Sequence, residues 1–265
     1  MDMFVFDIDG TLAHGDTPLT DLDKSEMNYH LEKGDAIVIA SGRPVCGAKK
    51  YLSQLMESPN RFCIGSNGSD VQSFAGEHYS RTGLTYADYL YVRKLCWKPG
   101  RAVYVYIGDE VGSHDHHWMV YEEYTWNKMT KLIDFNHEPL QPTDYITKIV
   151  VYSDHEDSLA LESQIKGMDF GHMRMVRSTP VFLEWINKDV DKSKGVQALA
   201  EKLHITDPLH IHTFGDSMND FYMIKNYDGT AMGNAMDEIK KVAKRVTLPV
   251  TEDGVGVALR DVFPR

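Results

Sequence analysis

The first part of the chain alternates short apolar runs with polar, helix-compatible segments. Residues 4–6, 36–40 and 61–64 are largely apolar runs without alternation, which is typical of strands buried on both faces of a parallel sheet. Residues 18–32 and 44–56, which lie between these runs, are compatible with helices. This order predicts an α/β fold built on a parallel sheet.

From about residue 71 the pattern changes, and strands outnumber helices. A short hairpin is expected around Ala75-Gly76. The predicted strands that follow are 102–107, 117–121, 146–152, 173–177 and 181–186, and the predicted helices are 84–95, 122–132 and 156–166. Such a cluster favours an α+β module with an antiparallel sheet, inserted at roughly 81–179.

The first pattern then resumes with a helix at 196–203 and a strand at 210–214. Two short strands, 230–232 and 246–248, flank a helix at 235–243. The expected α/β core is therefore discontinuous, with halves at 1–80 and 180–265.

Polar turns follow three of the predicted core strands. Asp7 and Asp9 end the first, Ser41 the second, and Asp216, with Asn219 and Asp220 nearby, follows the strand at 210–214. In an open parallel sheet these turns meet at one edge, where ligands bind. Aspartate and glycine are also ordinary turn residues, and a serine before a helix can be a simple cap. Neighbouring carboxylates repel each other, so a divalent cation such as Mg²⁺ is expected among Asp7, Asp9 and Asp216.

Composition narrows the range of partners. Among 265 residues, 28 basic against 39 acidic side chains give a formal net charge of −11, which argues against nucleic-acid binding. No apolar run is long enough for a membrane span, and the N-terminus does not look like a signal peptide. The three cysteines show no metal-ligand spacing and suit a reducing compartment, so we expect a cytoplasmic protein.

Four segments, in this order, resemble the sequence motifs of the haloacid dehalogenase-like superfamily. They are Asp7-Ile8-Asp9-Gly10-Thr11, Ser41-Gly42-Arg43, Val190-Asp191-Lys192 and Gly215-Asp216-Ser217-Met218-Asn219-Asp220. The inserted segment resembles the type IIB cap of the Cof-type phosphatases, and Met232-Gly233-Asn234-Ala235 and Glu252-Asp253-Gly254-Val255 also look like that branch. The resemblance implies a Rossmann-like core that carries a cap at 81–179.

The resemblance also implies roles for individual residues. Asp7 is the expected nucleophile that forms an aspartyl-phosphate, and Asp9 the expected general acid and base. Mg²⁺ is expected on Asp7, on the backbone carbonyl of Asp9 and on Asp216. Further expected contacts to the phosphoryl group come from Ser41, Gly42, Lys192 and Asn219, with Asp220 and Thr11 supporting the metal site behind them. Lys194 is the alternative lysine, but Lys192 alone keeps the spacing of the motif.

These features predict a Mg²⁺-dependent phosphatase that acts on a small phosphorylated metabolite, either a sugar phosphate or a phosphorylated cofactor. The alternatives are a phosphomutase or phosphotransferase with the same nucleophile, and a regulatory protein that binds phosphate without catalysis. Neither nucleic acid nor a membrane is expected as a partner, and the protein is expected as a monomer or a small homo-oligomer.

Aromatic and histidine residues are concentrated in the insertion. We expect Trp97, Trp118 and Trp126 to fill its small core rather than to contact a ligand. We interpret residues 114–117, with three histidines, as a solvated loop rather than a transition-metal site.

Overall fold

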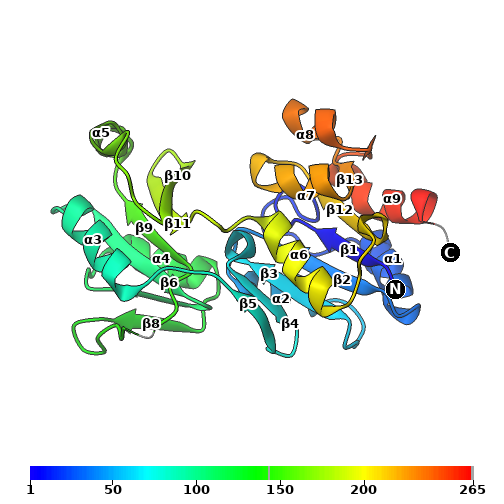
Figure 1. Cartoon of the computed structure of the whole chain (residues 1–265), viewed down its shortest axis with the longest axis horizontal. Helices are drawn as coiled ribbons and strands as arrows, with labels where there is room; N and C mark the ends of the chain where they lie inside the picture. Colours follow the sequence, from blue (N-terminus) through cyan, green and yellow to red (C-terminus); the bar gives the residue numbers. More distant parts are fainter. Residues whose placement is uncertain (143, 264–265) are drawn as a thin grey trace. The chain divides into compact units, whose positions relative to one another are not determined.

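The computed structural model describes residues 1–142 and 144–263, which form two compact units (Figure 1). The first unit combines Met1–Arg81 with Asp191–Arg265, and the second is Thr82–Val190. Each unit has its own cluster of buried apolar side chains. Among the described residues no helix has both the length and the apolar character that a membrane span requires.

The first unit is built on a mostly parallel sheet with the order β14-β13-β12-β1-β2-β3-β4-β5. β1 lies in its interior, pairs in parallel with β12 and β2, and has four buried residues, as the apolar run predicts. The strands are β1 (Met3–Phe6), β2 (Ala36–Ala40), β3 (Arg61–Gly65), β4 (Asp70–Ser73), β5 (His78–Arg81), β12 (Ile211–Gly215), β13 (Asp228–Ala231) and β14 (Arg245–Val246). Among these described strands, the pairs β3–β4 and β4–β5 are antiparallel and the other pairs are parallel.

Helices connect the parallel strands, so the carboxyl ends of the strands share one edge of the sheet. The helices are α1 (Asp21–Glu32), α2 (Val45–Leu52), α6 (Lys192–Lys202), α7 (Phe221–Asn226), α8 (Asp237–Val242) and α9 (Gly254–Val262). Short 3₁₀ turns lie at η1 (Ser66–Gly68), η2 (Pro208–His210), η3 (Met218–Asp220) and η4 (Val250–Glu252). The side chain of Asp191 caps α6 by accepting the N–H of Lys194, which fixes where this helix starts.

The second unit has a mostly antiparallel sheet with the order β10-β11-β9-β6-β7-β8, in which β7 and β8 are parallel. Its strands are β6 (Ala102–Ile107), β7 (Glu110–Ser113), β8 (Lys131–Asp134), β9 (Lys148–Tyr152), β10 (Met173–Thr179) and β11 (Phe182–Asn187). Its helices are α3 (Tyr86–Cys96), α4 (Trp118–Trp126) and α5 (His155–Ile165). The combination of a parallel-rich α/β core with an inserted, antiparallel α+β unit confirms the predicted fold class.

Two details of the predicted insertion are wrong. Residues 117–121 are not a strand, because His117 caps α4 by accepting the N–H of Met119 on its ring nitrogen Nδ1. The second unit also extends past 179, to Val190, since β11 pairs with both β9 and β10 in the inserted sheet.

The expectation that three tryptophans fill the core of the insertion is also wrong. Trp97, Trp118 and Trp126 are 47%, 58% and 73% exposed, whereas Trp185 is fully buried. The 114–117 loop is only partly solvated. His114 pairs through Nδ1 with the Tyr89 hydroxyl at 2.7 Å, and His116 is its one exposed histidine.

Candidate active site

The first catalytic candidate, Asp7, directly follows β1 and is 4% exposed. Its peptide N–H donates to the carbonyl of Phe214 at 3.1 Å, which continues the pairing of β1 with β12. The chain then turns at Gly10, whose φ is +88°. A Cβ at this position would lie 2.2 Å from Oδ2 of Asp216, so only glycine leaves room for that carboxylate.

The turn after β12 supplies two further carboxylates. Asp220, at the end of η3, accepts the N–H of Asp216 at 3.0 Å and the N–H of Ser217 at 3.2 Å through Oδ2. These two hydrogen bonds stabilise the turn through Oδ2 and leave Oδ1 of Asp220 available for another contact. Asp220 is fully buried, and Asp216 is only partly so.

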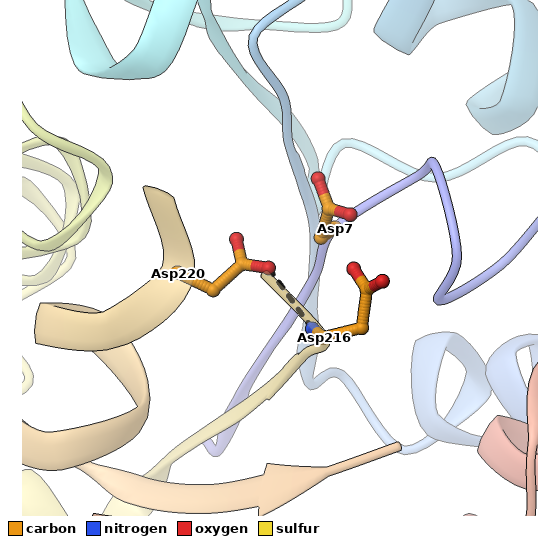
Figure 2. Close-up of side chains that lie close together, drawn as sticks. All are labelled: Asp7, Asp216 and Asp220. Carbon is orange, nitrogen blue, oxygen red and sulfur yellow. Dashed lines mark hydrogen bonds between the residues drawn. The ribbon is translucent and has the colours of Figure 1, made fainter. Parts of the chain in front are cut away.

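Three carboxylates meet at this edge of the sheet (Figure 2). One oxygen from each of Asp7, Asp216 and Asp220 lies within 4.8 Å of the others. Lys192, the first residue of α6, is completely buried, and its Nζ lies 2.5 Å from Oδ1 of Asp7 and 2.6 Å from Oδ1 of Asp220. Three carboxylates with one ammonium leave two negative charges in excess, which matches one divalent cation.

The pKa values of Asp7, Asp216 and Lys192 reflect this excess of negative charge and the burial of the cluster. Burial, followed by the charge of Asp220, raises the pKa of Asp7 to about 8, and the ammonium of Lys192 only partly opposes this. Burial and the charge of Asp220 likewise raise the pKa of Asp216 to about 6. Burial lowers the pKa of Lys192, but the facing carboxylates outweigh it and the pKa is raised overall. A bound cation would relieve the repulsion that raises the two carboxyl pKa values.

In the described part of the chain, two buried side-chain oxygens in the turns after β1 and β12 have no hydrogen-bond partner, namely Oγ1 of Thr11 and Oδ1 of Asp216. A buried carboxylate oxygen is rarely left without a partner, because its desolvation is costly. Oxygen donors from carboxylates are the ligands that Mg²⁺ prefers. These residues therefore fit a Mg²⁺ ion.

The turn after β2 presents the candidate phosphate-binding groups. Ser41 is buried, and its Oγ accepts the N–H of Arg43 at 3.0 Å. A Cβ on Gly42 would lie 3.3 Å from the side chain of Asn67, which accepts a hydrogen bond from Nδ2 of Asn219 at 3.1 Å. Asn67 thus links the turn after β2 to the turn after β12, a contact that the sequence motifs did not indicate.

Asp9 lies apart from the three clustered carboxylates. Its side chain is 53% exposed and is held by Arg43, whose Nε and Nη2 lie 2.9 Å and 2.5 Å from the two carboxylate oxygens. The contact of Arg43 with Asp9 was not predicted from the sequence, although the place of Arg43 in Ser41-Gly42-Arg43 was a signal for it. Of the two candidate lysines, Lys192 is buried among the carboxylates and Lys194 is exposed.

Comparisons with known proteins show which family the chain resembles. A family model described as haloacid dehalogenase-like hydrolase matches residues 4–259. A Streptococcus pyogenes protein with a provisional phosphatase name is 30% identical over 96% of this chain and 95% of its own length. A Bacillus subtilis protein, 5-amino-6-(5-phospho-D-ribitylamino)uracil phosphatase YcsE, is 24% identical over 97% of this chain and 94% of its own length.

Solved structures share the whole fold. A haloacid dehalogenase-like hydrolase from Bacteroides thetaiotaomicron is 27% identical, with a TM-score of 0.88 over 99% of each chain. The subclass IIB sugar phosphatase BT4131 is 21% identical, with a TM-score of 0.76 over 100% of each chain, and shares the fold with its inserted unit. The resemblance inferred from the motifs is thereby confirmed, and the chain belongs to the haloacid dehalogenase-like hydrolase family.

Proposed function

We propose that the protein is a Mg²⁺-dependent phosphatase that hydrolyses a small phosphorylated metabolite through an aspartyl-phosphate on Asp7. The observation that carries this proposal is the cluster of Asp7, Asp216 and Asp220, in which the buried Lys192 contacts Asp7 and Asp220 and two negative charges remain in excess. Phosphoryl transfer depends mainly on positioning and charge neutralisation, and such a group offers both.

In the first step a carboxylate oxygen of Asp7 attacks the phosphorus, and the bond from phosphorus to the alkoxide leaving group breaks. Asp9 gives a proton to the departing oxygen. In the second step water attacks the phosphorus of the aspartyl-phosphate while Asp9 takes a proton from it. The bond to Asp7 then breaks, which restores the Asp7 carboxylate and releases inorganic phosphate.

The other residues at the sheet edge bind and orient the reacting groups. Asp7, Asp216 and the backbone carbonyl of Asp9 are proposed to hold Mg²⁺ through their oxygens, and a bound ion would neutralise phosphoryl charge there. Asp220 orients the turn that carries Asp216, as its hydrogen bonds to that turn support. Thr11 is proposed to support the metal site, and its hydroxyl is buried without a hydrogen-bond partner among the described residues.

The phosphoryl oxygens are held by Ser41, the N–H of Gly42, Lys192 and Asn219. Lys192 donates to two carboxylates, and an ammonium has three N–H groups, so one donor remains for the substrate. We assign this chemistry to the unit of Met1–Arg81 and Asp191–Arg265. The name of the Bacillus subtilis relative, a phosphatase of a phosphorylated small molecule, supports the substrate class.

The test replaces the nucleophile and keeps its shape. Asp7→Asn should lower the turnover of an aryl phosphate by about a thousandfold or more, because the amide cannot form the aspartyl-phosphate. The matched control is Glu57→Gln, at an exposed acid, which should retain activity. Both variants are assayed with and without Mg²⁺ after circular dichroism has verified their folding.

Near-full activity of folded Asp7→Asn would rule out the proposal. A panel of phosphorylated metabolites, assayed for free phosphate, identifies the substrate. Transfer of the phosphoryl group to a second sugar hydroxyl without free phosphate would indicate a phosphomutase instead. No hydrolysis across the panel would indicate a regulatory phosphate-binding protein.

A further inference from the structure

Arg43 and Asp9 form a two-point contact at the edge of the candidate site. Nε of Arg43 lies 2.9 Å from Oδ2 of Asp9, and Nη2 lies 2.5 Å from Oδ1. Both oxygens of one carboxylate thus accept N–H groups from one planar guanidinium. Such fork-shaped contacts fix orientation as well as distance, which a single lysine contact does not.

Arg43 is itself anchored at both ends. Its peptide N–H donates to Oγ of Ser41 at 3.0 Å, so its backbone belongs to the turn proposed to bind phosphate. Its guanidinium also reaches Oδ1 of Asp16 through Nη1 at 3.5 Å and the carbonyl of Gly15 through Nη2 at 3.4 Å. Its side chain is 24% exposed, less than half the exposed fraction of Asp9. The more constrained partner therefore sets the position of the freer one.

We propose that Arg43 is a positioning residue for the second chemical step, in which it orients the Asp9 carboxylate that takes a proton from water. This inference rests on the proposed function. A carboxylate whose two oxygens both accept N–H groups from one guanidinium is held in one orientation, which sets the direction from which it can take a proton from water. As water attacks phosphorus, its proton passes to Asp9, and the electrons of the breaking P–O bond return to Asp7.

The two-point contact between Arg43 and Asp9 does not assist the first step. In that step Asp9 must carry a proton to the leaving oxygen, so one of its two hydrogen bonds with Arg43 must break. An aryl phosphate with a stable leaving phenolate needs little protonation, and its first step depends weakly on Asp9. Removal of Arg43 should therefore slow the second step more than the first with such a substrate.

The experiment separates the two steps by rapid mixing with p-nitrophenyl phosphate and Mg²⁺. Arg43→Ala should release nitrophenolate in a burst of about one equivalent per enzyme, followed by a steady rate about 10- to 100-fold below that of the wild type. Intact mass spectrometry should detect phosphorylated protein accumulating in this variant. Arg43→Lys should recover part of the steady rate, because one ammonium contact replaces the fork.

Lys50→Ala is the matched control. Lys50 pairs with Asp16 in the same group of charges and, among the described residues, forms no ion pair with Asp9, so its removal should leave both phases unchanged. A folded Arg43→Ala that loses burst and steady rate by the same factor, or that keeps the wild-type steady rate, overturns the proposal. If alanine prevents folding, Arg43→Lys decides in the same way. Wild-type protein that cannot hydrolyse any phosphate ester would instead overturn the proposed function.

Discussion

The environment of Asp7 strongly opposes the charge of its carboxylate. Burial and the neighbouring carboxylates raise its pKa from 3.8 to about 8. Between these values the folded protein keeps a proton on Asp7 that the unfolded chain has released. The stability that this proton contributes is complete below about pH 4 and is lost as the pH rises to about 8, with a slope of at most about 1.4 kcal/mol per pH unit.

Asp7→Asn removes this titration. In metal-free buffer, the free energy of unfolding of the wild type relative to Asp7→Asn should therefore fall between about pH 5 and about pH 8, as measured by urea titration. Added Mg²⁺ should reduce the slope, because a cation favours the carboxylate. A difference that stays constant over this pH range would contradict the raised pKa.

At the same scale, the sequence predicted which side chains lie at the candidate site better than it predicted which partners those side chains contact. The order of the motifs placed Asp7, Asp216 and Lys192 at strand and helix ends, and the structure brings them together. It could not predict that Asp9 turns to Arg43, because side-chain orientation depends on partners 34 positions away in the chain. The choice of Lys192 over Lys194 agrees with the burial of Lys192 among the carboxylates.

At the scale of elements, the start of α6 is held against η1. Gly68 has φ +102°, and a Cβ there would lie 2.2 Å from the carbonyl oxygen of Asp191, the residue before Lys192. Gly34 has a similar φ of +86° but open space around it. Alanine at either position is destabilised by the left-handed backbone conformation. Of the two, only Gly68→Ala also places a methyl group in steric conflict with the start of α6.

Gly68→Ala should therefore lower the free energy of unfolding by about 1–3 kcal/mol more than Gly34→Ala. It should also lower aryl phosphate turnover, because Lys192 moves with the start of α6. Urea unfolding and steady-state kinetics of the two variants measure both effects. Equal losses of stability in the two variants would show that α6 does not resist the added methyl group.

The elements of the first unit were easier to predict than those of the second. β1 and β2 are uninterrupted apolar runs, and both were found at the predicted positions. The prediction of a strand at 117–121 is wrong because the aromatic and β-branched composition of Trp118 to Tyr121 favours strands, whereas the capping contact of His117 starts a helix. Strand β11 was assigned to the wrong side of a boundary because only pairing reveals its sheet.

At the scale of the whole molecule, the two units have separate buried cores, and only one of them contains tryptophan. All four tryptophans lie in Thr82–Val190, and Trp185 is fully buried in the core of that unit. The proposed Mg²⁺ site lies entirely in the other unit. Tryptophan fluorescence therefore follows the unfolding of one unit, and Mg²⁺ binding acts on the other.

Mg²⁺ should stabilise the first unit by about 2.7 kcal/mol at a concentration 100 times its dissociation constant, because only the folded site binds it. In urea, hydrogen exchange of peptides from β1 and β12 should show unfolding at a higher urea concentration when Mg²⁺ is present. The transition followed by tryptophan fluorescence should keep the same midpoint urea concentration. Asp216→Asn should abolish the shift in β1 and β12, since it removes one proposed ligand. If Mg²⁺ moves both transitions by the same amount, the units unfold as one cooperative body and the prediction is wrong.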